Sequence, residues 1–151
     1  MDGLGGHPHP LDSSGRLEFA EHLVAEDNPL VSRVIVNRIW HHLFGQGIVA
    51  SVDDFGKLGS PPSHPELLDF MATEFMEKGW SIKTLIRNLA LSSTYQMSST
   101  PSALALELDP DNHYLQRMPM KRLEAEQIRD HILLCSGDLK PGMYGPSVDA
   151  Y

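Results

Sequence analysis

Residues 28–47 read NPLVSRVIVNRIWHHLFGQG, and they predict a central helix on which the other elements pack. Asn28 is a strong N-cap, and Pro29 fits the first helical position, where its missing N–H would have no partner in any case. Gly45 predicts the end of the helix, because glycine readily adopts the left-handed conformation that closes many helices. Apolar side chains between them cover most of the helical circumference, which is typical of a helix enclosed by other elements.

The polar residues of this segment allow two interpretations. Arg33, Asn37 and His41 recur every four residues and share one stripe, while Arg38 and His42 form a second pair on a neighbouring face. The functional interpretation is a polar pocket formed by Asn37, His41 and His42, in which a histidine serves as acid, base or ligand. The structural interpretation is that both arginines form ion pairs with acidic loops, and we favour it because ion-pair networks are commoner than catalytic sites.

An arginine in an enclosed helix requires carboxylate or carbonyl partners, since an unpaired buried charge is very unfavourable. The nearest acidic pair is Asp53-Asp54, in the irregular segment that follows the helix. We therefore predict ion pairs of Arg33 and Arg38 with acidic loops such as this one. If the Arg38 pair is buried, Arg38→Ala should lower the unfolding free energy by about 3 to 5 kcal/mol. A calcium loop is the alternative role for Asp53 and Asp54, but the alternating oxygen ligands of an EF-hand are missing.

The whole chain predicts an all-α fold of about five helices around the central one, with long irregular Gly/Pro-rich connections. Residues 1–15 are expected to be a flexible leader or a segment added for expression, and residues 16–151 a single helical domain. A first helix is predicted over 16–26, with apolar residues such as Leu17, Phe19 and Val24 turned inward.

Two amphipathic helices are predicted to follow as an antiparallel hairpin. The first opens at Ser63, which has capping-box spacing with Glu66, and ends at Gly79. The second is capped by Ser81 and carries apolar residues at helical spacing. Residues 98–119 then form a long connection, whose length suggests that it packs on the core or serves function.

The last predicted helix covers residues 121–136, and its charged residues are candidates for structural ion pairs. These candidates are Arg122, Glu126, Arg129 and Asp130. Ala125, Ile128, Ile132 and Cys135 share one face, which we expect to belong to the core.

Composition excludes several classes of protein. The formal charge of −8 argues against nucleic-acid binding, which requires a concentrated positive surface. A single cysteine excludes an internal disulfide framework, a Cys-rich metal site and covalent haem attachment within this chain. No apolar stretch is long enough to insert into a membrane, and no phosphate-binding loop, nucleophile elbow or His-Glu-x-x-His motif occurs.

Several long stretches together resemble one family. They are NPLVSRVIVNRIWHHLFGQGIV (28–49), DDFGKLGSPPSHPELLDFMATEFMEKGWSIKTLIRNLALSSTYQMSS (53–99), DPDNHYLQR (109–117) and KRLEAEQIRDHILLCSGDL (121–139). This ordered set is similar to the planctomycete domain of unknown function 1553, over residues 16–148. The family continues beyond the end of this chain, so the resemblance implies a domain truncated at its C-terminal end.

The family resemblance also implies a context. Members are typically large secreted or envelope-associated proteins that often carry a cytochrome-c-like domain, so an extracytoplasmic location is expected. Carbohydrate-related roles have been inferred for such proteins without a defined reaction. The family has no established catalytic residues, and none is carried over to this sequence.

Three functional hypotheses follow. The first is a non-catalytic helical module, without cofactor or metal, whose partners are neighbouring domains of the same larger protein, with self-association possible through a truncated face. The second is part of a carbohydrate-related hydrolase or redox enzyme, with candidate acids Asp53, Asp54, Glu126 and Asp130. The third is a metal site formed by His41 or His42 with Asp53, Asp54 or His64, although adjacent helical histidines diverge by about 100°. The absence of a recognisable catalytic constellation favours the first hypothesis.

Overall fold

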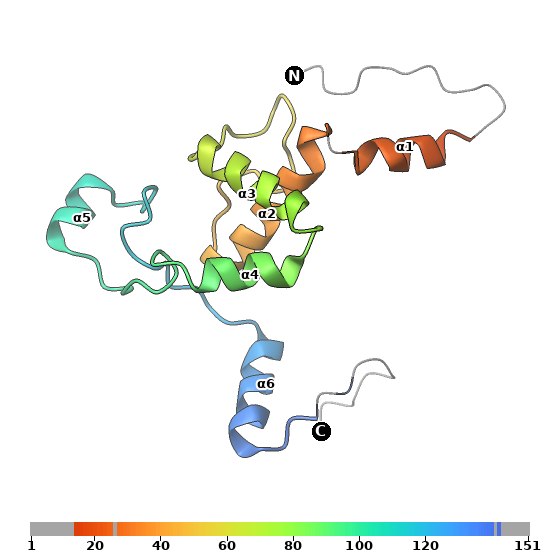
Figure 1. Cartoon of the computed structure of the whole chain (residues 1–151). Coiled ribbons are helices and arrows are strands. Elements are labelled where there is room, and N and C mark those ends of the chain that lie inside the picture. Colours follow the sequence, from red (N-terminus) through yellow and green to blue (C-terminus); the bar gives the residue numbers. More distant parts are fainter. Residues whose placement is uncertain (1–13, 26, 141, 143–151) are drawn as a thin grey trace. The chain divides into compact units, whose positions relative to one another are not determined.

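The computed structural model describes residues 14–25, 27–140 and 142, and in these residues it contains six helices and no strand (Figure 1). The helices are α1 (Arg16–Leu23), α2 (Pro29–Phe44), α3 (Pro65–Glu77), α4 (Ile82–Ala90), α5 (Ala103–Leu108) and α6 (Ala125–Ser136). The chain divides into two compact units, residues 1–120 and residues 121–151. The predicted all-α class is confirmed. The proposed leader lies outside the described residues, apart from residues 14 and 15.

The predicted central helix is confirmed as α2. The Asn28 side chain accepts a hydrogen bond from Leu30 N at 2.9 Å, and Gly45 ends the helix with a φ of 83°. Every fourth residue of one face is buried, namely Ser32, Val36, Trp40 and Phe44, with Asn37 beside them. On other faces Leu30, Arg38 and His42 are exposed, so α2 is buried on one side rather than over its whole circumference.

The core of the first unit lies between α2, α3 and α4. Figure 1 shows α2 and α3 side by side, and these two helices share the most extensive helix–helix packing among the described elements. Phe44, Phe75 and Leu85 are members of the same buried cluster and come from the three helices in turn. Ser81 caps α4 as predicted, because its hydroxyl accepts from Thr84 N at 3.3 Å.

The segment that opens α3 differs from its prediction. His64 occupies the N-cap without a side-chain capping bond, so the Ser63 and Glu66 capping box does not form. The Ser63 hydroxyl instead donates to Ile48 O at 3.2 Å and lies 2.9 Å from His64 Nδ1. Ser63 therefore ties the start of α3 to the segment that follows α2.

Two predictions about the first unit are wrong. The helix α1 ends at Leu23, and none of its eight residues, all described, is buried; Leu17, Phe19 and Val24 are exposed rather than inward. The stretch predicted as an irregular connection contains the short helix α5, which is capped by Ser102.

The second unit contains α6, which begins four residues later than predicted. A capping box joins Glu124 and Gln127 at its start, and Gly137 closes it with a φ of 80°. None of its twelve residues, all described, is buried, so the face predicted to lie in the core is exposed, Cys135 included. Among the described residues, no helix is long and apolar enough to cross a membrane.

Candidate functional site

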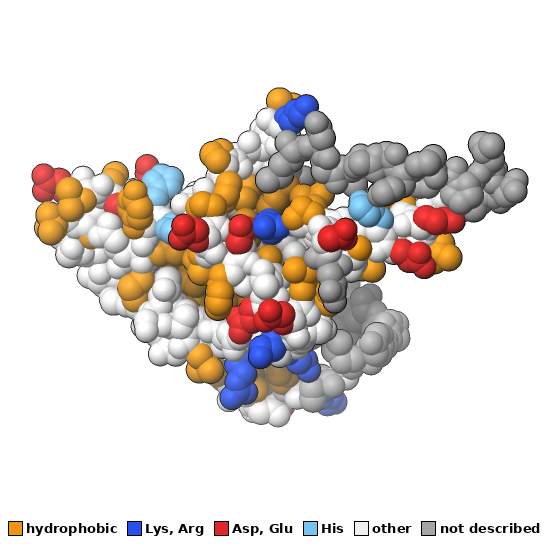
Figure 2. All heavy atoms as spheres, turned by 45° about the horizontal axis from the view of Figure 1, so that its top comes forward, with side chains coloured by type: hydrophobic (Ala, Val, Ile, Leu, Met, Phe, Trp, Pro, Cys, Tyr) orange, Lys and Arg blue, Asp and Glu red, His pale blue; other side chains and the backbone are white. Residues whose placement is uncertain are grey.

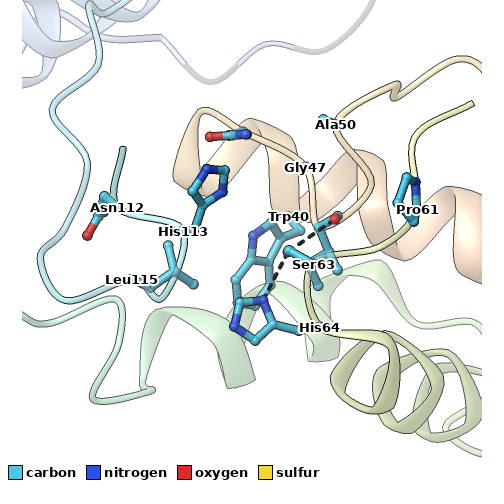
Figure 3. A pocket seen from close by; sticks show the side chains of 11 residues that line it. Trp40, Gly47, Ala50, Pro61, Ser63, His64, Asn112, His113 and Leu115 are labelled. Atoms are coloured by element: carbon cyan, nitrogen blue, oxygen red, sulfur yellow. Dashed lines mark hydrogen bonds between the residues drawn. The ribbon is translucent and has the colours of Figure 1, made fainter. Parts of the chain in front are cut away.

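A pocket of about 130 Å³ opens in the first unit where three segments meet (Figure 3). The end of α2 and the residues after it contribute Trp40, Gln46 and Gly47. The segment that leads into α3 contributes Ser63 and His64. The loop after α5 contributes Asn112, His113 and Leu115.

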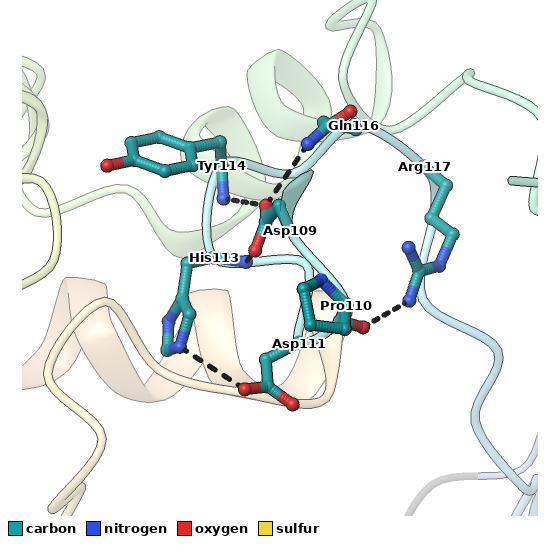
Figure 4. A network of polar contacts seen from close by, with 7 residues as sticks. All are labelled: Asp109, Pro110, Asp111, His113, Tyr114, Gln116 and Arg117. Carbon is teal, nitrogen blue, oxygen red and sulfur yellow. Dashed lines mark hydrogen bonds and ion pairs between the residues drawn. The ribbon is translucent and has the colours of Figure 1, made fainter. Parts of the chain in front are cut away.

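The loop of residues 109–117 is held by a buried carboxylate (Figure 4). Asp109 accepts hydrogen bonds from His113 N at 2.8 Å, from Tyr114 N at 2.9 Å and from Gln116 Nε2 at 3.4 Å. The Tyr114 N–H is the main reason that the pKa of Asp109 lies below its ordinary value. The other two hydrogen bonds and the nearby His113 ring act in the same direction, against desolvation, which raises that pKa. This carboxylate fixes the backbone that presents His113 to the pocket.

A second set of bonds closes the same loop. Asn112 Nδ2 donates to Arg117 O at 2.9 Å, and Arg117 N donates to Asn112 Oδ1 at 3.2 Å. The Arg117 guanidinium donates to Pro110 O at 2.9 Å. Asn112 and Leu115 have left-handed φ values of 58° and 52°. That conformation is unfavourable for leucine, and it persists here because the surrounding hydrogen bonds determine the backbone.

The opposite wall of the pocket is fixed by Asn37. Its amide donates to Val49 O at 3.0 Å and accepts from Val49 N at 2.9 Å, which ties the segment after α2 back onto the helix. Gly47 is required where this segment passes Asn37, since a Cβ at that position would lie 2.4 Å from Val49 O and 2.9 Å from Asn37 Nδ2. Side-chain to backbone bonds therefore hold both of these walls.

The two histidines of the pocket differ in their contacts. Because the Ser63 hydroxyl donates to Ile48 O, a lone pair of Ser63 Oγ is left for His64 Nδ1–H, and His64 Nε2 has no hydrogen-bond partner within the described residues. His113 Nε2 lies 4.0 Å from Asp111 Oδ2, too far for a hydrogen bond. The Tyr114 ring meets the His64 ring edge-on at 6.2 Å between centroids.

The two arginines of the central helix have different partners. Arg33 Nε lies 2.6 Å from Asp69 Oδ1 on α3, and not against the Asp53-Asp54 loop. Arg38 Nη1 lies 3.4 Å from Asp53 Oδ1, but the two side chains are 57% and 82% exposed. Asp54 Oδ1 accepts from Gly56 N at 2.8 Å. The buried ion pair that we predicted for Arg38 is therefore a surface pair, because its side of α2 faces solvent.

Asn37, His41 and His42 do not line this pocket. Asn37 is bonded to Val49, His42 is exposed, and His41 Nδ1 is buried with no hydrogen-bond partner in the described part of the chain. No three His, Cys, Asp or Glu side chains of the described residues gather where they could hold a metal ion. The histidine–aspartate metal site considered above is thus not assembled from these residues.

The candidate residues of α6 are all exposed. Arg129 Nη1 lies 3.4 Å from Asp130 Oδ1, with both side chains more than half exposed. Arg122 precedes the first helical turn, and within the described residues neither Arg122 nor Glu126 forms an ion pair.

Sequence reasoning missed Gln46, Asn112, His113 and Leu115 as residues of a pocket. The segment DPDNHYLQR (109–117) was quoted only for its family resemblance, although its density of side chains able to bond local backbone is a signal for an ordered turn. The sequence pattern does not indicate that this loop lies at the same pocket as the end of α2.

Comparison with known proteins identifies a family. A family model described as PSD1, protein of unknown function (DUF1553), matches residues 15–151, which is almost the whole chain. No curated protein and no solved structure matches the chain significantly.

Proposed function

The chain belongs to the DUF1553 family, and we propose that it is a non-catalytic helical module that docks on neighbouring domains of a larger extracytoplasmic protein. The larger protein and its location are what the resemblance described above implies. The docking role is argued from the chain's own surface.

The observation that carries this proposal is that α6 is closed at both ends but buries no side chain. Its capping box satisfies backbone donors at the start, and the N–H groups of Asp138 and Leu139 bond Leu133 O at 2.9 and 3.0 Å at the end. Ala125, Ile128, Ile132 and Cys135 form its exposed apolar face, which we name the α6 face.

A helix of this length is marginal in water unless an apolar face is packed. Its sequence nevertheless specifies both ends and an amphipathic pattern, which is what a helix that packs on a partner requires. Other apolar side chains also reach the surface of the described residues, as Figure 2 shows for one view, and Leu17, Phe19 and Leu58 are among those exposed.

The alternative function, a carbohydrate-related hydrolase or redox enzyme, has less support. Among its candidate acids, Asp53 faces Arg38 and the Asp54 carboxylate binds its own loop, so both are engaged in local structure. Neither residue lines the pocket of the first unit.

The proposal can be tested with the native cysteine of the α6 face. A benzophenone attached to Cys135 would be irradiated in envelope extract of the source organism, and cross-linked peptides identified by mass spectrometry. We expect one recurrent segment from another domain of the same polypeptide. The matched control carries Cys135→Ser and Glu126→Cys, which moves the probe to the polar side of α6.

A second variant checks that the α6 face makes the contact. Ile128→Asp with Ile132→Asp should abolish the cross-link without changing the melting of the first unit, since neither side chain is buried. Equal cross-linking from both cysteine positions, or cross-links only to a second copy of this chain, would contradict docking on a neighbouring domain.

A further inference from the structure

We propose that the pocket of the first unit is a binding site for one uncharged, ring-sized polar molecule that carries hydrogen-bond acceptors and donors. Nothing in this proposal depends on the docking of α6. It rests on the construction of the pocket walls, on the polar groups left without partners, on the charge of the lining and on the volume.

The walls are held by hydrogen bonds within the chain itself. Asp109 and Asn112 hold one wall through five hydrogen bonds, and Asn37 holds another through two. The left-handed backbone of Leu115 is a strained conformation within this construction, and such residues concentrate at ligand sites. A preformed wall reduces the ordering that binding would otherwise require.

Several polar groups at the pocket make no side-chain hydrogen bond within the described residues, although the His113 ring lies 4.0 Å from Asp111. Within the described residues, no hydrogen bond involves Trp40 Nε1, the Gln46 amide, His64 Nε2 or the ring of His113. Figure 3 shows the indole nitrogen of Trp40 on the side of its ring nearer His113. An indole N–H can only donate, so its partner in the ligand is an acceptor. His64 Nε2 is an acceptor when Nδ1 carries the proton, whereas the Gln46 amide and the His113 ring can donate or accept.

The charge of the lining selects a neutral ligand. None of the described residues that line the pocket is Asp, Glu, Lys or Arg, although the whole chain carries a formal charge of −8. A charged group bound in this open pocket would lose part of its hydration without meeting an opposite charge in the lining, which is unfavourable. Two carboxylates contact His113 without lining the pocket: Asp109 Oδ1 accepts from the His113 backbone N–H at 2.8 Å, and Asp111 Oδ2 lies 4.0 Å from His113 Nε2.

The size of the pocket admits a single ring. Its volume of about 130 Å³ is close to the roughly 150 Å³ of an engineered protein cavity that binds benzene. One face of Trp40 is covered by Phe44, stacked at 4.1 Å between centroids. The apolar contacts open to a ligand are therefore the remainder of the indole and the side chains of Ile48, Ala50, Pro61 and Leu115. A ligand of this size is expected to bind with a dissociation constant on the order of 1 mM.

The test uses the two tryptophans of the full chain. Their indole N–H signals are followed by ¹⁵N–¹H NMR while uracil, a planar heterocycle, or myo-inositol, a hydroxylated ring, is added. We expect saturable movement of the Trp40 signal and none of the Trp80 signal, because Trp80 lies in the turn between α3 and α4 and does not line the pocket. Trp80→Phe assigns the two signals.

Variants then locate the binding. Gln46→Ala with His113→Ala should weaken binding of the active probe at least about tenfold, while His131→Ala, an exposed histidine of α6, should not. Binding of only one probe would assign the ligand to heterocycles or to hydroxylated rings. No saturable movement of the Trp40 signal with either probe, or tighter binding of the anion benzoate than of both, would overturn the proposal.

Discussion

The side-chain amide of Asn37 makes two hydrogen bonds with the backbone of Val49, one in each direction. Both residues are buried, and Asn37 is completely inaccessible to solvent. This exchange imitates the pairing of two strand residues, although one partner is a side chain on a helix. The Asn37 amide therefore satisfies the N–H and C=O of Val49, which lies in a buried segment without regular secondary structure. In a helix or a sheet, other backbone groups would form these hydrogen bonds.

Asn37→Leu should lower the unfolding free energy by about 2 to 4 kcal/mol. The substitution keeps the approximate volume but leaves the N–H and C=O of Val49 without partners, and each unsatisfied buried group is unfavourable by about 1 to 3 kcal/mol. Urea unfolding followed by circular dichroism measures the loss. Asn88→Leu is the control, because Asn88 is exposed and its amide makes only a 3.4 Å contact with Glu74. A loss below about 1 kcal/mol for Asn37→Leu would show that Val49 finds other partners.

Gly47→Ala should destabilise the first unit by about 1 to 3 kcal/mol, the usual range for overpacking. The new methyl group would overlap Val49 O, a backbone atom that cannot move without breaking the Asn37 bonds. Gly142→Ala is the control, since a Cβ there meets nothing within 4 Å. Comparison of the two midpoints of urea unfolding tests this prediction, and equal midpoints would contradict it.

Arg38→Ala should lower the unfolding free energy by less than about 1 kcal/mol. The larger loss expected from the sequence applied to a buried pair, whereas both side chains of the Arg38–Asp53 pair are mostly exposed. The remaining effect should diminish further in high salt, which screens exposed charges. Unfolding in low and high salt, with Arg87→Ala as an exposed arginine control, provides the measurement. A salt-independent loss above about 3 kcal/mol would restore the buried interpretation.

Acid should weaken the loop of residues 109–117 through Asp109. The pKa of this carboxyl is lowered in the folded chain, so its ionised form stabilises the fold above the ordinary value of 3.8. That stabilisation is lost as pH falls through the lower folded value. Asp109→Asn should therefore have a lower unfolding free energy than the wild type at neutral pH. This difference in unfolding free energy should disappear in strong acid. Urea unfolding of both proteins, measured from neutral pH to strong acid, tests this prediction. A difference in unfolding free energy that does not change with pH would exclude Asp109 as the source of the acid sensitivity. A difference equal to that of Asp111→Asn would also exclude it.

The sequence predicts those elements whose signals are local. Asn28, Ser81 and Gly45 mark helix ends correctly because a cap acts within one turn of its helix. The short helix α5 was missed because six residues between two prolines are too few to show the apolar repeat that distinguishes a helix from a loop. The α6 face was assigned to the core because an amphipathic period identifies an apolar side without identifying what covers it.

The candidate site was less predictable than the fold. The pocket joins residues more than sixty positions apart, such as Gln46 and His113, and no periodicity links them. Asn37 was singled out correctly as an unusual polar residue in an apolar helix, but its partner is a backbone group, which carries no sequence signal. Composition could not show that the Arg38 side of α2 faces water.

The chain carries separate spectroscopic reporters for its two units. Both tryptophans lie within residues 1–120, whereas the single cysteine, exposed on α6, lies within residues 121–151. Indole fluorescence therefore follows the first unit alone, and an environment-sensitive dye on the thiol follows the second, without any change of sequence. If the two units melt independently, the two emission curves will have different midpoints, and a single two-state transition will not fit them together.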